Sequence, residues 1–315
     1  MRRVTRRCPL LIALTLSAAC AAATSGPLAG AAGHRAVRLR ACTSGVRLST
    51  WSTSRLAAQV VAVPVMASDV GGISREVRSG FGGILLFGTS APTSLGATLR
   101  RLEAATPQHL GLLVMTDEEG GGVRRLDNLA GAFPWARTMA QTMSPAAISA
   151  VARRVGTQLL AAGVNTDLAP VLDVDGRDVA PGASDPDGWR SFSGATSTVI
   201  ADSTAFSAGL AAAHVLAVVK HFPGLGASSG NTDFGPAATV PWPQLKASAL
   251  HAFEHAIAGG APAIMVANAH VPGLTPLPAT LSSKVMVEVL RNWLGFKGLI
   301  PVSYTHLTLP TILRV

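Results

Sequence analysis

Two motifs in this 315-residue chain combine charged side chains with glycine turns, an arrangement that suggests ligand binding. The first covers residues 116–125 (TDEEGGGVRR), where three acids stand beside three glycines and two arginines. Glycine lets the backbone approach a ligand closely, and a carboxylate with a guanidinium can hold hydroxyl groups from two sides. A solvated turn with local ion pairs is the alternative interpretation. The glycines do not form a phosphate loop, because the Gly-Lys-Ser/Thr of a Walker motif is absent.

The second motif covers residues 220–226 (KHFPGLG), in which a Lys-His pair precedes a Pro-Gly turn. A buried histidine beside a surface lysine is the alternative interpretation of this pair. A third motif, residues 189–193 (WRSFS), places Arg190 in a loop rich in turn-forming residues. An arginine in such a loop is usually solvated, so this motif alone indicates little.

Short apolar runs that alternate with helical stretches predict the elements that position these motifs. The predicted strands are residues 60–65, 83–87, 111–116, 165–170, 216–221, 263–268 and 298–302. Their nearly continuous apolar character is typical of parallel strands covered on both faces. Ser144-Pro145 predicts the start of a helix that ends near Ala162, and Ser197 and Ser282 are candidate N-caps of later helices. Repeated βα units of this kind form either a (β/α)₈ barrel or a doubly wound sheet.

The positions of the polar residues favour the barrel. Asp117 and Asp173 each follow a predicted strand, and Lys220 and His221 end a third. A barrel draws its site from several strand ends at one face. A dinucleotide-binding sheet would need G-x-G-x-x-G after its first strand, and residues 66–72 (MASDVGG) lack it. We therefore predict an α/β fold of the (β/α)₈ TIM-barrel type with about seven strands present.

Taken in order, the three motifs resemble the N-terminal domain of family 3 glycoside hydrolases, in particular the bacterial β-N-acetylhexosaminidases. The resemblance extends from about residue 59 to residue 300. It implies a glycosidase that needs neither a metal nor an organic cofactor. The sugar-binding residues that it implies are Asp117, Arg125, Arg190, Lys220 and His221. Mixed donors and acceptors at fixed points suit a ligand with neutral hydroxyl groups and an acetamide.

The catalytic groups depart from the pattern of that family. A retaining glycosidase needs a nucleophilic carboxylate and an acid/base. The resemblance places the acid/base in an Asp-x-His segment, where this chain has Asn231 and Asp233. Asp233 is the candidate acid/base if a dry or anionic environment raises its pKa, and it can equally be an ordinary loop residue.

The resemblance places the nucleophile soon after residues 295–298 (GFKG), but no Asp or Glu follows Glu288. We therefore expect a chain truncated before the nucleophile, whose barrel lacks its eighth βα unit. Residues 301–315 are interpreted as a non-native tail. Residues 56–300 are then the glycoside hydrolase barrel domain, and the literal chain is expected to be inactive.

Residues 1–25 predict an export leader, because four arginines precede an apolar run over residues 9–19. That run is too short to span a membrane. Residues 16–20 (LSAAC) resemble a bacterial lipobox with the leucine one place too far from Cys20. Two outcomes stay open: lipidation of Cys20 with attachment to the cell envelope, and ordinary cleavage followed by secretion. Residues 26–55 are predicted to form a flexible tether.

The net charge of +9 does not indicate nucleic-acid binding. Residues 1–55 hold nine arginines and no acid, so the remaining 260 residues are balanced at 17 basic and 17 acidic side chains. A small carbohydrate is the predicted partner. The leading hypothesis is an exported retaining hydrolase that releases terminal β-linked N-acetylglucosamine from peptidoglycan fragments or chitooligosaccharides. A β-glucosidase of the same family and a non-catalytic sugar-binding envelope protein are the alternatives.

Overall fold

The computed structural model describes residues 48–302. The predicted leader over residues 1–25, the lipidation of Cys20, and residues 303–315 of the predicted tail lie outside the described residues. Within the predicted tether, residues Leu48–Thr50 form the 3₁₀ helix η1, and helix α1 (Thr53–Gln59) begins. The hydroxyl of Ser52 accepts a hydrogen bond from the Arg55 amide at 3.3 Å and so caps α1.

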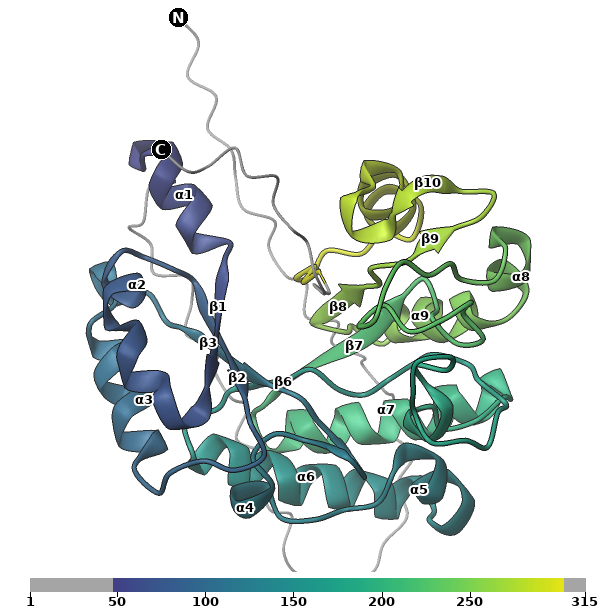
Figure 1. Ribbon diagram of the computed structural model, residues 1–315, viewed down its shortest axis with the longest axis horizontal. Coiled ribbons are helices and arrows are strands. Elements are labelled where there is room, and N and C mark those ends of the chain that lie inside the picture. The colour runs from purple at the N-terminus through teal and green to yellow at the C-terminus, as the bar shows by residue number, and fades with distance from the viewer. Residues whose placement is uncertain (1–47, 303–315) are drawn as a thin grey trace, which may run out of the picture. The chain divides into compact units, whose positions relative to one another are not determined.

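Six parallel strands form one curved sheet in the order β1-β2-β3-β6-β7-β8 (Figure 1). These strands are β1 (Ala62–Met66), β2 (Gly83–Phe87), β3 (Leu113–Thr116), β6 (Thr166–Asp167), β7 (Leu216–Phe222) and β8 (Ala263–Val266). Leu299 and Val302 continue the parallel pairing beyond β8, with Ile264 N–H donating to the Leu299 carbonyl at 3.0 Å. Six of the seven predicted strands are therefore confirmed, residues 298–302 form two parallel bridges in place of the seventh, and the sheet is barrel-like but does not close.

Helices connect the strands, and α3 (Leu95–Ala104), α6 (Pro145–Ala161), α7 (Thr196–Ala212) and α9 (Ala249–Ala258) pack on the outer side of the curved sheet (Figure 1). The other helices are η2 (Ala67–Ile73), α2 (Ser74–Arg78), η3 (Pro107–His109), α4 (Asp127–Ala130), α5 (Ala136–Thr142), η4 (Gly188–Arg190), α8 (Trp242–Ala247), η5 (Ala279–Leu281) and the π-helix η6 (Lys284–Trp293). Two antiparallel pairs, β4 (Glu118–Gly120) with β5 (Val123–Arg124) and β9 (His270–Val271) with β10 (Thr275–Pro278), stand apart from the main sheet. Within residues 48–302, no helix is both long enough and apolar enough to cross a membrane.

Two of the three predicted helix caps are confirmed. The Ser144 hydroxyl accepts from the Ala147 amide at 3.3 Å, and the Ser282 hydroxyl accepts from the Val285 amide at 3.3 Å. The prediction for Ser197 is wrong, because α7 begins one residue earlier and contains Ser197 within its first turn. Ser193 instead accepts from the Ala195 amide at 3.0 Å and fixes the turn that leads into this helix.

The two faces of the sheet pack into different cores, as the alternation of side chains along a strand requires. On β7, Ala217 and Val219 face the helices and join the large core beneath α6 and α7. Val218 points the other way, into a small interior core. That core also contains Leu85, Met115, Leu168, Ala263 and Met265. Lys220 follows Val218 by two residues, so the same alternation directs it to the inner side of the sheet.

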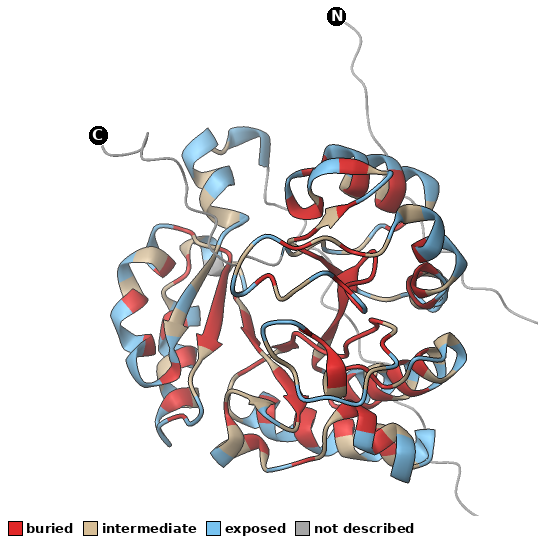
Figure 2. Ribbon diagram, turned by 45° about the vertical axis from the view of Figure 1, so that its right-hand side comes forward, coloured by how far each residue is buried: buried red, intermediate tan, exposed pale blue. Residues whose placement is uncertain are grey.

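The strands at the two edges of the sheet are less covered than the central ones. Most of the central strands are buried, as Figure 2 shows. By contrast, Met66 at the end of β1 is 49% exposed and Leu299 beyond β8 is 42% exposed. These apolar side chains at both edges are consistent with a barrel that is not closed.

We predict that Gly209→Ala destabilises the protein although alanine favours a helix. A Cβ at Gly209 would lie 2.3 Å from the Ser149 carbonyl oxygen of α6, so α6 and α7 must move apart. Helix propensity alone would make the substitution stabilising by about 1 kcal/mol. We expect instead a loss of about 2 kcal/mol in the free energy of unfolding, measured by urea denaturation. Gly111→Ala, where a Cβ meets no atom within 4 Å, is the control, and equal effects of both changes would contradict the account.

Candidate functional site

A network of buried ion pairs joins the end of β3 to the end of β7. Lys220 Nζ lies 2.7 Å from Asp117 Oδ1 and 2.5 Å from Glu119 Oε1. Asp117 and Glu119 stand two residues apart in an extended segment, so both carboxylates point to the inner side of the sheet. Asp117 and Lys220, each at the end of a predicted strand, therefore meet at one end of the sheet, although 103 positions separate them in the chain.

Arg190 reaches the same network from the turn η4. Its Nε lies 2.7 Å from Glu119 Oε2 and its Nη2 lies 2.9 Å from Glu119 Oε1, which makes a bidentate pair. Its Nη1 donates to the Pro186 carbonyl at 2.8 Å. Glu119 is thus held by two cations from two different segments.

The electrostatics keep Glu119, Arg190 and Lys220 charged. Burial alone would raise the pKa of Glu119, but the charges of Arg190 and Lys220 hold it well below its usual range. Burial opposes the charged form of Lys220 and of Arg190 as well, yet the neighbouring carboxylates raise the pKa of both. The two cations and the carboxylates of Asp117 and Glu119 sum to zero, so this network of four side chains has no net charge.

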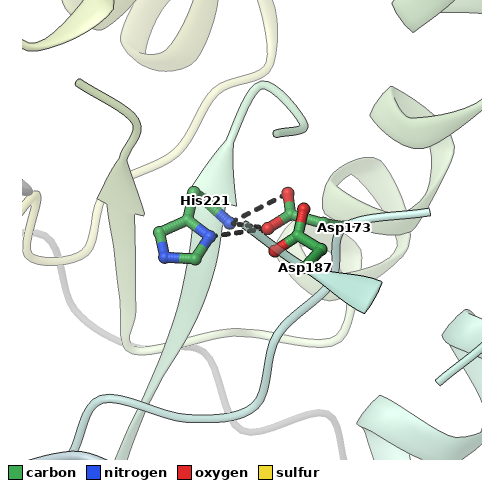
Figure 3. Close-up of side chains that lie close together, drawn as sticks. All are labelled: Asp173, Asp187 and His221. Atoms are coloured by element: carbon green, nitrogen blue, oxygen red, sulfur yellow. Dashed lines mark hydrogen bonds and ion pairs between the residues drawn. The ribbon is translucent and has the colours of Figure 1, made fainter. Parts of the chain in front are cut away.

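His221 is oriented by Asp173, a buried carboxylate beyond β6 (Figure 3). Asp173 Oδ1 accepts from the amides of Leu225 at 2.6 Å and His221 at 3.2 Å, and Asp173 Oδ2 lies 2.6 Å from His221 Nδ1. Burial, together with the charges of Arg190 and Lys220, lowers the pKa of His221 to about 3. The neutral ring therefore carries its proton on Nδ1, as the partner at that atom requires, and Nε2 remains an acceptor.

The carboxylate of Asp187 lies beside Asp173 and His221, but it does not share their hydrogen bond (Figure 3). It is fully buried, and within residues 48–302 neither of its carboxylate oxygens has a hydrogen-bond partner, while Arg190 Nη1 lies 4.0 Å from Asp187 Oδ1. Burial and the charge of Asp173 raise the pKa of Asp187 well above its usual range. Ligand atoms of Asp173, Asp187 and His221 lie within 4.8 Å of one another, the spacing at which a metal ion can be held. The present geometry uses two of these atoms in the Asp173–His221 hydrogen bond.

The remaining sequence-predicted site residues lie outside the ion-pair network. Arg125 is tied to Asp117 through its backbone amide at 3.3 Å, and its guanidinium carbon lies 5.7 Å from the centre of the Phe87 ring. Asp233 has an exposed side chain, and its amide donates to Asn231 Oδ1 at 2.9 Å. No hydrogen bond or ion pair among residues 48–302 joins the Asp233 carboxylate to the network.

Sequence reasoning missed Glu119, Asp173 and Asp187 as site residues. The alternation of side chains along an extended segment could have identified Glu119. Two residues beyond Asp117, it places Glu119 on the same side as Asp117 and Glu118 on the opposite side. Asp173 lies at a strand end, where its position had been noted without a role. No sequence pattern identifies Asp187, which depends on the path of the loop.

The glycines of the first motif have a different role from the one expected. A Cβ on Gly121 would lie 1.9 Å from the Trp135 ring, and a Cβ on Gly120 would lie 2.2 Å from the Pro134 carbonyl oxygen. Gly120 and Gly121 also have φ of +102° and +57°, which disfavour other residues. The glycines therefore allow the β4–β5 hairpin to pack against residues 133–135, and it is this protein segment that approaches their backbone.

A second acidic pair lies beneath the hairpin. Glu118 Oε1 accepts from the Leu126 amide at 2.5 Å, and the Glu118 amide donates to Asp167 Oδ1 at 3.0 Å. Burial raises the pKa of Glu118 to about 7 despite these amides, and burial also raises the pKa of Asp167 well above its usual range. Among the residues that the structure describes, no cationic side chain is bonded to the pair, which distinguishes it from Glu119.

We predict that Glu118→Gln becomes increasingly favourable as the pH rises. The folded protein binds the Glu118 proton more tightly than the unfolded chain, so this group costs stability as the pH rises from about 4.5 through about 7. Glutamine keeps the acceptor for the Leu126 amide and never ionises. The stability of E118Q relative to the unsubstituted protein should therefore rise by about 2–3 kcal/mol between pH 4.5 and pH 8.

Urea denaturation at a series of pH values measures this difference. Glu103→Gln, at an exposed position, is the control for removing a solvated carboxylate. A relative stability of E118Q that does not change with pH would show that Glu118 is not held in its neutral form.

Comparisons with known proteins agree with this architecture. The model of the glycosyl hydrolase family 3 N terminal domain matches residues 65–307. Beta-hexosaminidase LpqI of Mycobacterium tuberculosis is 36% identical over 220 residues, which cover 68% of this chain and 54% of that protein. An uncharacterized secreted glycosyl hydrolase of Arthroderma benhamiae is 34% identical over 233 residues, which cover 70% of this chain and 64% of that protein.

Among solved structures, the beta-N-acetylhexosaminidase from Beutenbergia cavernae superposes with a TM-score of 0.70 at 31% identity. The match covers 80% of this chain and 78% of that one. The chain spans about half the length of LpqI, so it corresponds to part of that relative. Sequence and structure together show that this chain belongs to glycosyl hydrolase family 3 and carries the N-terminal domain of that family.

Proposed function

We propose that this chain binds a terminal β-linked N-acetylglucosamine through the ion-pair network of Asp117, Glu119, Arg190 and Lys220. The observation that carries the proposal is that Glu119 and Lys220 are buried, that Asp117 and Arg190 are largely buried beside them, and that the four charges balance at the strand ends of a family 3 domain. A network without excess positive charge suits a neutral sugar better than a phosphate or a carboxylate ligand.

The unused donors and acceptors support a polyhydroxylated ligand. Lys220 has three N–H donors, and its two carboxylate partners leave one for a ligand. Asp117, whose side chain is 15% exposed, and His221 Nε2 provide acceptors. Fixed donors beside fixed acceptors match the hydroxyl groups of a sugar, each of which can donate and accept. Arg125 belongs to the proposed set through its link to Asp117.

The relatives named beta-hexosaminidase favour an N-acetylhexosamine over glucose, and a β-glucosidase remains the second candidate within the family. The proposed reaction is retaining hydrolysis of peptidoglycan fragments or chitooligosaccharides by the whole protein. Asp233 is the proposed acid/base, and the exposed position of its loop means that the sugar would have to bury it. The relative named as secreted supports export, for which the proposed devices are the leader over residues 1–25 and lipidation of Cys20.

We predict that the chain binds N-acetylglucosamine and that Lys220→Met weakens binding at least tenfold. The substitution removes the donor that faces the ligand and leaves Asp117 and Glu119 with one cation fewer. A tenfold loss corresponds to about 1.4 kcal/mol, a small value for a buried charged donor. Titration calorimetry with N-acetylglucosamine, and with glucose for comparison, measures it.

The matched control is Lys246→Met on α8, where the lysine is exposed. Asp117→Asn is a milder test at the same site, since it keeps the side-chain shape. Unchanged sugar binding in both K220M and D117N, with the fold intact by circular dichroism, would show that the sugar does not bind at the proposed site. Tighter binding of glucose than of N-acetylglucosamine would favour the β-glucosidase.

We predict only background hydrolysis of 4-nitrophenyl N-acetyl-β-glucosaminide by these 315 residues. The resemblance places the nucleophile beyond residue 298, and no carboxylate occurs there. Loss of a covalent nucleophile lowers turnover by several orders of magnitude. Release of 4-nitrophenol measures the rate. Rapid hydrolysis with retention would show that another carboxylate is the nucleophile, and Asp233→Asn would then test whether Asp233 takes part.

A further inference from the structure

Arg137 on α5 is buried and binds the backbone of a distant loop. Only 7% of the residue is exposed. Its Nε donates to the Ser191 carbonyl at 3.2 Å, and its Nη2 donates to the carbonyls of Gly188, at 3.3 Å, and Asp175. In the described part of the chain, no carboxylate forms an ion pair with it. A buried guanidinium that bonds only to carbonyls indicates that these contacts matter to the arrangement of the loop.

The three carbonyls lie at the two ends of one loop, residues 175–191. Asp175 begins this loop, whereas Gly188 and Ser191 flank the turn that carries Arg190. The loop has ties of its own, since the Gly188 amide donates to Asp185 Oδ1 at 3.0 Å. Arg137, which lies outside the loop, adds hydrogen bonds to the backbone on both sides of Arg190.

Residues 133–135, just before Arg137, contact the hairpin that carries Glu119, the partner of Arg190. The Gly121 amide, two residues after Glu119, donates to the Phe133 carbonyl at 2.9 Å. Trp135 packs against Gly121, and its ring centre lies 6.2 Å from that of Trp189. Residues 133–137 therefore contact both segments that form the Glu119–Arg190 ion pair.

We propose that Arg137 is a positioning residue, which sets the place of the Arg190 guanidinium against Glu119 and thereby the geometry of the sugar site. The inference rests on the proposed function of that site. An arginine is required because its planar fork reaches carbonyls on different sides, whereas a lysine has a single nitrogen at its tip. A bidentate ion pair depends on such placement, since both of its hydrogen bonds lengthen when one backbone moves.

The first test observes Arg190 itself, without any sugar. Arg190 Nε–H, which donates to Glu119, should give a protected ¹⁵N resonance in the unsubstituted protein. Arg137→Lys should shift this resonance and speed its hydrogen exchange about tenfold or more. The matched control is Arg291→Lys, because Arg291 also donates to two carbonyls, those of Phe296 and Gly298, in a different segment. An unchanged Arg190 resonance in R137K, or an equal change in R291K, would overturn the proposal.

The second test is a double-mutant cycle on N-acetylglucosamine binding. Arg137→Lys should weaken binding about tenfold when Arg190 is present and less than twofold in an Arg190→Lys background, since it acts through Arg190. An equal loss in both backgrounds would show that Arg137 acts elsewhere and would overturn the inference. If R190K alone leaves binding unchanged, the proposed function fails, and the Arg190 resonance still decides whether Arg137 positions that side chain.

Discussion

Glu119 is a buried carboxylate between the buried Lys220 and the largely buried Arg190, and the arrangement of the strand ends follows from the need to keep all three paired. Removal of one partner from a buried ion pair typically costs about 3–5 kcal/mol, because the other charge is left without compensation. Lys220 comes from β7, Arg190 from a loop beyond β6, and Glu119 from the hairpin beyond β3. A shift of any of these segments would break the same network. The ion pairs therefore fix the relative positions of segments that the sheet alone would leave adjustable.

Three other buried acids, Glu118, Asp167 and Asp187, have no cationic side chain at hydrogen-bond distance among residues 48–302. Glu118 and Asp167 lie below the hairpin, and burial raises the pKa of each. Neither oxygen of Asp187 accepts a hydrogen bond from residues 48–302, its contact with Arg190 Nη1 is 4.0 Å long, and burial raises its pKa as well. Lys220 and Arg190 thus pair with Glu119, whereas the neighbouring acids Glu118, Asp167 and Asp187 have raised pKa values and bind protons more readily. Ionised, balanced groups then face the position proposed for the sugar, and His221 is held neutral beside them.

Much of the fold could be predicted from the sequence, because each strand is a short apolar run and parallel strands are buried on both faces. The polar residues at the predicted strand ends indicated that a site lies at one end of the sheet, and Asp117 and Lys220 do meet there. Alternation, carried past Asp117, would also have identified Glu119. The roles of Asp187 and Arg137 could not be predicted, since both depend on the path of the loop over residues 175–191. The glycine motif was misinterpreted because Gly120 and Gly121 have the same conformational freedom whether a ligand or a tryptophan lies against them.

The central claim is that the balanced network of Asp117, Glu119, Arg190 and Lys220 binds a terminal N-acetylglucosamine. A crystal structure of the chain with N-acetylglucosamine tests it most directly. The account predicts sugar hydroxyl groups within hydrogen-bond distance of Lys220 Nζ, Asp117 and His221 Nε2, with the Glu119 ion pairs retained. A sugar bound elsewhere, or a network that breaks when the sugar binds, would contradict the account.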